Sequence, residues 1–294
     1  MKPTSLHSFV SLLCLFLLSC LHLQAAPKLP NLIFIMVDDM GYHDLGCYGS
    51  KTILTPNVDR MAKEGMRFTD CYSGDTVCAS ARSILMTGYH KGHTPVRGNS
   101  GGIPLFPEDV TVAEVLKKAG YVTGGFGKWG LGPTDSTGSP IRQGFDRFYG
   151  YNCQRNAHSF FPPFLDDDEG IETINEKAIP GHQRKPQGEI VADDYRSKTY
   201  APDRILAEAL EFLDANKGNP FFLYCPFVEP HVAMHPPREW VERYPVEWDK
   251  AKGVYRGQNG YLPHPRPRAG YAAMISDLDE HVGAILKRLE KHGL

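Results

Sequence analysis

The chain has 294 residues, and its 32 Lys and Arg residues against 34 Asp and Glu residues give a net charge of -2 at pH 7. Such a balance provides no excess of positive charge that would bind nucleic acid, so we expect no nucleic-acid partner. A chain of this length can bury one hydrophobic core, and we expect one domain after its leader.

The first residues have the pattern of a secretory signal. An apolar run from residue 9 to 18 is too short to span a bilayer, and small residues follow at Ala25 and Ala26. We therefore expect a signal peptide over residues 1–25, export to the periplasm or the cell exterior, and no transmembrane span in the mature chain. A lipid anchor is the alternative, because the four residues that end at Cys20 resemble a lipobox.

Buried strands that alternate with amphipathic helices predict a mostly parallel, doubly wound α/β sheet. Residues 31–37 form a continuous apolar run, typical of a strand buried on both faces. A helix is predicted to begin at Thr55-Pro56 and to end at Gly65, because a capping residue precedes a proline at its first position. A strand-like segment then covers residues 66–73.

The alternation continues in the second half of the chain. Thr111 and Glu114 form a capping box at the start of a helix, and residues 121–126 are predicted to be the next strand. Apolar residues at helical spacing over 205–213 indicate another helix, and residues 221–225 indicate another strand.

Three polar stretches rich in Pro and Gly show no sustained period and are predicted to be long surface loops: residues 131–140, 166–199 and 236–267. The acidic run of residues 166–168 lies in the second of them. We interpret this run as solvated rather than as a metal cluster, because no matching ligands surround it. No internal repeat is present.

An apolar stripe from Tyr271 to Leu289 predicts the last helix, with Gly293 as its stop. The sequence then ends where an α/β protein usually adds another strand. We therefore expect this chain to be the amino-terminal part of a longer protein, with its carboxyl-terminal part missing. In that case Ile275, Leu278 and Val282 should be exposed.

Five of the 7 cysteines follow residue 26, and an odd number cannot all pair internally: Cys47, Cys71, Cys78, Cys153 and Cys225. At least one of them is a free or modified thiol. Cys78 is the strongest candidate, because it opens one of four short motifs that stand at predicted strand ends or helix starts: Asp38-Asp39, Cys78-Ala79-Ser80-Ala81-Arg82, Gly127-Lys128-Trp129 and Pro230-His231.

In this order, the four motifs resemble those of the type I sulfatases, which are arylsulfatase-like members of the alkaline phosphatase-like superfamily. The resemblance implies a three-layer α/β/α catalytic domain over residues 29–294, as its amino-terminal portion. It also implies hydrolysis of sulfate esters in a sulfated carbohydrate or an aryl sulfate. In that family the signature cysteine is oxidised to formylglycine, whose hydrate attacks the ester, so a formylglycine-generating maturation enzyme becomes an expected partner of Cys78.

The resemblance implies a role for each matched residue. Cys78, Arg82, Lys128 and His231 would be catalytic, and Lys128, His231 and His158 would bind the substrate. Asp38, Asp39 and modified Cys78 would hold Ca²⁺, with Mg²⁺ as the alternative. In this scheme Arg82 steadies the hydrate, Lys128 binds the sulfate, and His231 protonates the leaving alkoxide.

The sequence departs from the family pattern in three places. Ser80 stands where the family has Pro or Ala, and Gly130 stands where it often has a histidine. His158, His90 and His93 are open candidates to replace that histidine. The Asp-Asn or Asp-His pair that completes the family metal site is absent. Two other functions therefore stay open: a phosphonate or phosphodiester hydrolase of the same superfamily, and an inactive binding protein.

Overall fold

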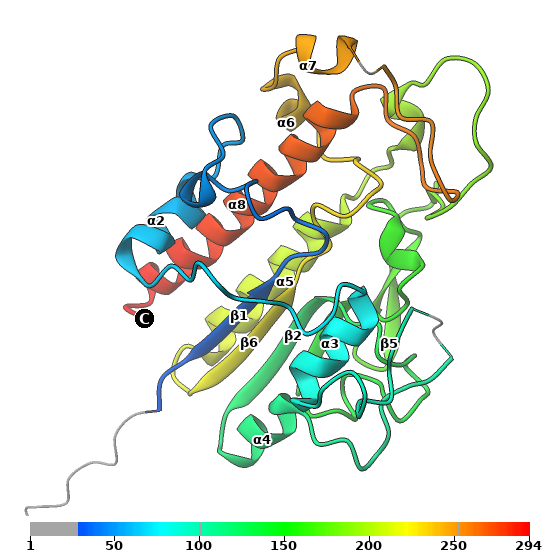
Figure 1. Cartoon of the computed structure of the whole chain (residues 1–294). Coiled ribbons are helices and arrows are strands. Elements are labelled where there is room, and N and C mark those ends of the chain that lie inside the picture. Colours follow the sequence, from blue (N-terminus) through cyan, green and yellow to red (C-terminus); the bar gives the residue numbers. More distant parts are fainter. Residues whose placement is uncertain (1–28, 100–101, 252) are drawn as a thin grey trace, which may run out of the picture. The chain divides into compact units, whose positions relative to one another are not determined.

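A six-stranded sheet forms the centre of the unit from Asn31 to Leu294 in the computed structural model, which describes residues 29–99, 102–251 and 253–294 (Figure 1). The strands lie in this order: β1 (Leu32–Met36), β6 (Phe221–Pro226), β2 (Val122–Lys128), β3 (Arg147–Tyr151), β4 (Phe164–Asp167) and β5 (Gly170–Thr173). The first four are parallel, and β4 and β5 add an antiparallel hairpin. The predicted signal peptide and Cys20 lie outside the described residues.

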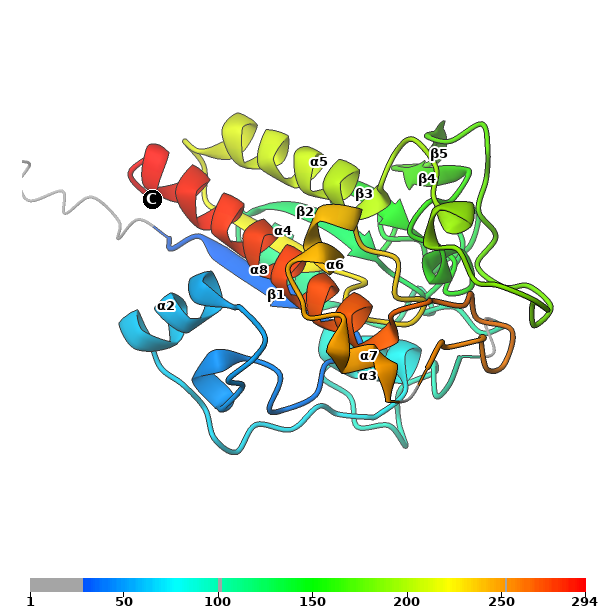
Figure 2. The same cartoon turned by 90° about the horizontal axis from the view of Figure 1, so that it is seen from above.

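Helices cover both faces of the sheet (Figures 1 and 2). One face carries α5 (Ala201–Asn216) and α8 (Pro267–Lys291), and the other carries α3 (Cys78–Thr87) and α4 (Val112–Lys118). The remaining helical segments lie between these elements or pack on α8: α2 (Pro56–Glu64), α6 (Arg238–Glu242), α7 (Glu247–Lys250) and the short turns η1 (Gly46–Tyr48), η2 (Asn156–His158) and η3 (Ala192–Tyr195). The architecture is therefore the expected three-layer α/β/α fold.

Strand β6 shows why its residues form a central strand. Phe221, Leu223 and Cys225 contribute to the core beneath α5 and α8, whereas Phe222 and Tyr224 contribute to the core beneath α3 and α4. Every residue of this strand is buried. A continuous apolar run is thus the sequence pattern that a strand covered on both faces requires.

Two sequence expectations for local structure are confirmed at helix starts, and one expected strand is wrong. Helix α2 begins at Pro56, and both hydrogen bonds of the predicted capping box join Thr111 and Glu114. Residues 66–73 do not form a strand. Their apolar side chains, such as Phe68, are exposed, because no neighbouring strand pairs with this segment.

The apolar face of α8 is buried, contrary to expectation: Ile275, Leu278 and Val282 are each at most 3% exposed. Helix α2 packs against α8. The Asp279 carboxylate of α8 accepts hydrogen bonds from the N–H groups of Asn57 at 3.0 Å and Val58 at 2.8 Å. Those groups are among the first N–H groups of α2, which have no partner within the helix. The carboxylate therefore fastens the start of α2 to the middle of α8.

The predicted loop over residues 166–199 begins with the β4–β5 hairpin instead. Asp166 belongs to β4, is buried, and accepts the N–H of Asn152 at 2.8 Å. Asp167 and Asp168 form ion pairs with Arg147 of β3. The interpretation of residues 166–168 as a solvated run is therefore wrong for Asp166, and its two neighbours are anchored by a guanidinium.

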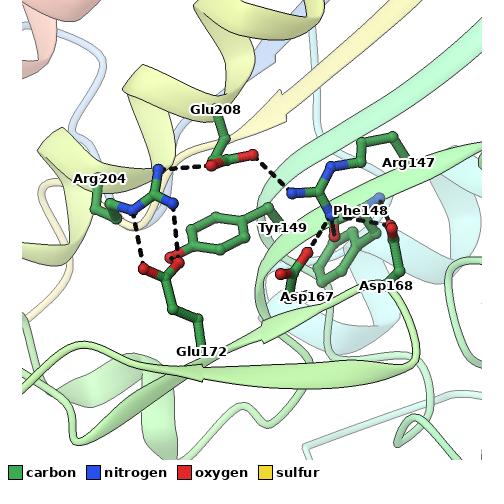
Figure 3. Close-up of polar contacts among 8 residues, drawn as sticks. All are labelled: Arg147, Phe148, Tyr149, Asp167, Asp168, Glu172, Arg204 and Glu208. Carbon is green, nitrogen blue, oxygen red and sulfur yellow. Dashed lines mark hydrogen bonds and ion pairs between the residues drawn. The ribbon is translucent and has the colours of Figure 1, made fainter.

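A network of ion pairs fastens the hairpin edge to α5 (Figure 3). Glu208 of α5 contacts Nη2 of Arg147 and Nη1 of Arg204, each at 2.6 Å. Arg204 also binds the Glu172 carboxylate of β5 at 2.9 Å, and the same carboxylate accepts the Tyr149 hydroxyl. The Glu208 side chain is 12% exposed, so it lies at the protected centre of the network.

All five cysteines of the described residues are free. No helix within residues 29–99, 102–251 and 253–294 is long and apolar enough to cross a bilayer.

We expect Glu208→Ala to lower the free energy of unfolding by about 2 kcal/mol, because two guanidinium groups lose a largely buried charged partner. Denaturant unfolding would measure the change. Glu211→Ala, an exposed carboxylate on the same helix, is the matched control and should stay within about 0.5 kcal/mol of the wild type. Equal effects of the two substitutions would show that the network adds no stability.

Candidate active site

The carboxyl ends of three neighbouring parallel strands bring the sequence motifs together. Asp38 follows β1, Lys128 ends β2, and His231 follows β6. Cys78 is the first residue of α3. Because parallel strands end at one edge of the sheet, residues that are 193 positions apart in the sequence, Asp38 and His231, meet in a single site.

Asp38 is the centre of this site. Its Oδ2 atom lies 2.6 Å from Nζ of Lys128 and 3.3 Å from Nη2 of Arg82. Burial alone would raise the pKa of this carboxyl group, but the charges of Arg82 and Lys128 outweigh burial and hold the pKa well below its usual range. Asp38 is therefore a fixed negative charge between two cations.

Lys128 and Arg82 are both buried, and Arg82 also donates a hydrogen bond to the carbonyl of Lys128. The glycine before the lysine allows this approach. Gly127 has a φ of 140°, and a Cβ atom there would lie 2.2 Å from the carbonyl oxygen of Pro226 in β6. Only a residue without a side chain lets β2 deliver Lys128 to Asp38 at this distance from β6.

Asp39 differs from its neighbour in exposure and backbone. Its side chain is 53% exposed, and its φ of 64° lies in the left-handed region. Oδ2 of Asp39 is 3.3 Å from Nε2 of His231, and the hydroxyl of Tyr271 donates to its carbonyl oxygen at 3.4 Å. Because Asp39 adopts this left-handed conformation, the chain turns there, and the Asp39 carboxylate faces His231 from the solvent-exposed side of the site.

Cys78 lies at the amino end of α3 and lines a cavity of about 540 Å³, together with Asp38 and Asp39. Asn99 braces this position: its Nδ2 atom is 3.7 Å from Sγ of Cys78, and its Oδ1 atom accepts the N–H of Ala79 at 3.0 Å. Burial raises the pKa of the Cys78 thiol. At neutral pH the thiol form is therefore favoured over the thiolate.

Two histidines stack beside this cavity. The rings of His231 and His158 are 4.8 Å apart and 6° from parallel, and Nδ1 of His158 lies 3.3 Å from Nε2 of His182. Tyr261 packs its ring against all three histidines. Burial lowers the pKa of His158 to about 3, assisted by the charge of His231. Burial, together with the charge of Lys128, also lowers the pKa of His231.

The predicted site residues meet here: Asp38, Asp39 and Cys78 line the cavity, and Arg82, Lys128, His231 and His158 contact them directly or through one another. His90 and His93 instead lie exposed on the turn after α3. The place beside Gly130 is filled by Gln154, because a Cβ atom at Gly130 would lie 2.3 Å from its Nε2 atom. A glutamine amide, rather than any of the three histidines, thus occupies that space.

Sequence reasoning missed four residues that shape the site: Asn99, Gln154, His182 and Tyr261. His182 and Tyr261 lie within stretches that were predicted to be long loops, where no periodicity ties a residue to a neighbour. Asn99 is 21 positions from Cys78. No signal in a single sequence identifies these contacts.

The donor atoms are suited to part of a cation site. One atom each from Asp38, Cys78 and His231 lies within 4.8 Å of the others, and the Asp39 carboxylate faces the same cavity. The carboxylate oxygens of Asp38 and Asp39 are hard donors of the kind that Ca²⁺ and Mg²⁺ bind. Together with residue 78, these two side chains would fill only part of the six to eight ligand positions of Ca²⁺.

Comparison with known proteins identifies the family. The model of the Sulfatase family matches residues 30–294, so the chain belongs to that family. Arylsulfatase A of Homo sapiens is 37% identical over 237 residues, which cover 74% of this chain and 45% of the relative. The aligned part of this chain therefore corresponds to less than half of that protein.

Solved structures agree with the fold. A Bacteroides fragilis protein proposed to be a sulfatase has a TM-score of 0.68 and 26% identity, over 92% of this chain and 61% of its own. Ps i-CgsB in complex with k-i-k-neocarrahexaose has the same TM-score and identity, over 90% of this chain and 55% of its own.

Asp38→Asn in metal-free protein should lower the free energy of unfolding by about 3 kcal/mol, because Lys128 and Arg82 keep their buried charges without a counter-charge. Asp39→Asn is the matched control, since it makes the same change one residue later, at an exposed position where Asn tolerates a positive φ. We expect it to cost under about 1 kcal/mol. Urea unfolding in the presence of a chelator would measure both changes. Similar costs would contradict the stabilising role of Asp38 in the buried triad of Asp38, Lys128 and Arg82.

Proposed function

We propose that this member of the sulfatase family hydrolyses the sulfate esters of a sulfated carbohydrate or an aryl sulfate, with Cys78 oxidised to formylglycine. The observation that carries the proposal is the convergence of two buried cations, Lys128 and Arg82, with Cys78 at a helix start, all held around Asp38. We also propose that the protein is exported, on the strength of its first 25 residues.

The charges of the site suit a sulfate group. A sulfate ester is an anion that repels nucleophiles, so a site that cleaves it must first neutralise charge. Lys128 and Arg82 supply two cations, and the first N–H groups of α3 attract an anion through the helix dipole. Because Asp38 already orients both cations, little reorganisation is needed when an anion binds.

The environment of Cys78 supports an oxidised nucleophile. A thiol reacts as its thiolate, and burial raises the pKa of Cys78, so an unmodified side chain would be a poor nucleophile here. Oxidised to formylglycine and hydrated, residue 78 would supply a hydroxyl as the attacking group. Arg82, one helical turn further on α3, would steady that group. A formylglycine-generating enzyme is therefore the partner that this proposal requires.

His231 would give a proton to the leaving alkoxide. The backbone carbonyl of Val232 contacts its Nδ1 atom, and its Nε2 atom faces Asp39, which lines the cavity. Its lowered pKa makes the protonated ring a stronger acid than an ordinary imidazolium. His158 stacks on this ring and would contact the substrate from the same side.

Asp38, Asp39 and oxidised residue 78 would hold the divalent cation, for which we propose Ca²⁺, with Mg²⁺ as the alternative. A bound cation supplies positive charge to a sulfate oxygen and polarises the attacking hydroxyl. The complex of Ps i-CgsB with an oligosaccharide supports a carbohydrate substrate.

A measurable fraction of Cys78 should carry the mass loss of thiol-to-aldehyde conversion when the protein is isolated from its native host. Mass spectrometry of the peptide that contains Cys78 would measure this fraction. Ser80→Ala is the informative comparison: the Ser80 hydroxyl binds Asp75 and the carbonyl of Val77 in the folded chain, but the variant restores a residue type found in the family motif. A free thiol throughout, in both proteins, would rule out formylglycine catalysis.

We expect Lys128→Ala and His231→Ala to lower sulfate ester turnover by about 10² to 10³, which is the usual cost of removing one charge-stabilising group. The measurement is kcat/KM in preparations with oxidised Cys78, and His90→Ala is the control from outside the site. His231 acts as an acid only when protonated, and its pKa is lowered. Activity should therefore fall as the pH rises through a value below about 6.5.

Unchanged kinetics in either variant would remove that residue from the site. Faster turnover of phosphodiesters than of sulfate esters by the wild type would favour the alternative activity instead.

A further inference from the structure

A second group of ligand-type side chains lies between α5 and α8. Asp203 stands in the first turn of α5, and Asp277 and His281 stand one turn apart on α8. One donor atom from each of the three lies within 4.8 Å of the others. Neither the sequence motifs nor the proposed reaction uses any of these residues.

The distances in this group suit a tetrahedral ion. Nε2 of His281 lies 3.1 Å from Oδ1 of Asp203 and 3.8 Å from Oδ1 of Asp277. Ligands at 2.0–2.2 Å from a tetrahedral Zn²⁺ lie roughly 3.3–3.6 Å from one another. The two observed distances bracket this range, so small shifts of the two carboxylates would complete the geometry.

Glu229 supplies the independent observation. Its side chain is 1% exposed, and among the described residues neither of its carboxylate oxygens has a hydrogen-bond donor. Oε1 of Glu229 faces Nδ1 of His281 at 3.3 Å. A histidine that binds a metal through one ring nitrogen usually turns the other toward a carboxylate. Glu229 stands in that position.

The charges of the group also favour a cation. Three carboxylates, from Asp203, Asp277 and Glu229, surround one imidazole. The Tyr200 hydroxyl is also buried without a hydrogen-bond partner among the described residues.

We propose that Asp203, Asp277 and His281 bind a divalent transition-metal cation, Zn²⁺ by their ligand types, and that Glu229 orients His281 by accepting its Nδ1–H. One imidazole nitrogen with two carboxylate oxygens is a ligand set that zinc accepts, whereas Ca²⁺ prefers oxygen alone. The Asp203 side chain is 61% exposed, which leaves an open side for entry of the ion and for water ligands.

The position of Glu229 gives the ion a structural effect. The carbonyl oxygen of Glu229 accepts the N–H of Asp38 at 3.1 Å, and His231 follows two residues later. A cation that ties α5 to α8 and fixes His281 would therefore also hold the segment that carries His231.

Zinc titration of metal-free protein, followed by calorimetry and by the thermal unfolding midpoint, tests the proposal. We expect one zinc equivalent to bind the wild type, and Asp203→Asn to weaken this affinity at least about 10-fold, since even the loss of an orienting partner costs 10- to 100-fold. Glu211→Gln, an exposed carboxylate of the same helix, should leave the affinity unchanged. Because Asp203 is exposed, its variant should fold, which circular dichroism would check.

Cys78→Ser separates this site from the cluster of Asp38, Cys78 and His231, and it should keep the tight zinc equivalent. Zinc binding that Cys78→Ser abolishes and Asp203→Asn retains would assign the ion to the other cluster and overturn the proposal. The absence of tight zinc binding in the wild type would overturn it too, leaving His281 as an ion-paired imidazolium. The proposed sulfatase reaction would stand in both cases, since it does not use these residues.

Discussion

The buried carboxylate of Asp38 is the interaction on which the site depends. Lys128 comes from strand β2 and Arg82 from helix α3, which covers one face of the sheet, and each would carry an uncompensated buried charge without Asp38. The packing of β1, β6 and β2 is therefore coupled to charge balance as well as to apolar burial. Asp38 also holds these two cations beside Cys78. The residue that stabilises this edge of the sheet therefore also prepares the edge to bind an anion.

Glu229 connects this triad with the opposite layer. Its carbonyl oxygen accepts the N–H of Asp38, and its side chain faces His281 in α8. One residue thus joins the end of β1, the segment that follows β6, and the layer of α5 and α8. Such a residue explains how His231, which lies outside any regular element, keeps a defined position next to Asp39. Strand ends supply the approximate location of a functional group, and contacts between layers supply its orientation.

Much of the fold and of the site could be predicted, because both follow from local patterns. Burial on both faces makes β1 and β6 continuous apolar runs, and the end of each run locates Asp38 and His231. Strands β3, β4 and β5 were not predicted. Strand β3 contains a glycine and lies between β2 and the β4–β5 hairpin, so its stability comes from neighbours that are distant in sequence. His182 and Tyr261 were missed for the same reason, since they reach the site from long connections that have no period.

Two of the departures from the family pattern, at Gly130 and Ser80, have local structural substitutes. Gln154 fills the space beside Gly130, and the hydroxyl of Ser80 is satisfied by Asp75 and by the carbonyl of Val77. Neither departure leaves a void or opens the amino end of α3. Their consequences must therefore be chemical: Gln154 cannot donate or accept a proton as a histidine does, and Ser80 alters the sequence that the proposed maturation enzyme would read. For this reason an intact fold is no measure of catalytic competence in this protein, and only the oxidation state of residue 78 and the rate of ester cleavage report on it.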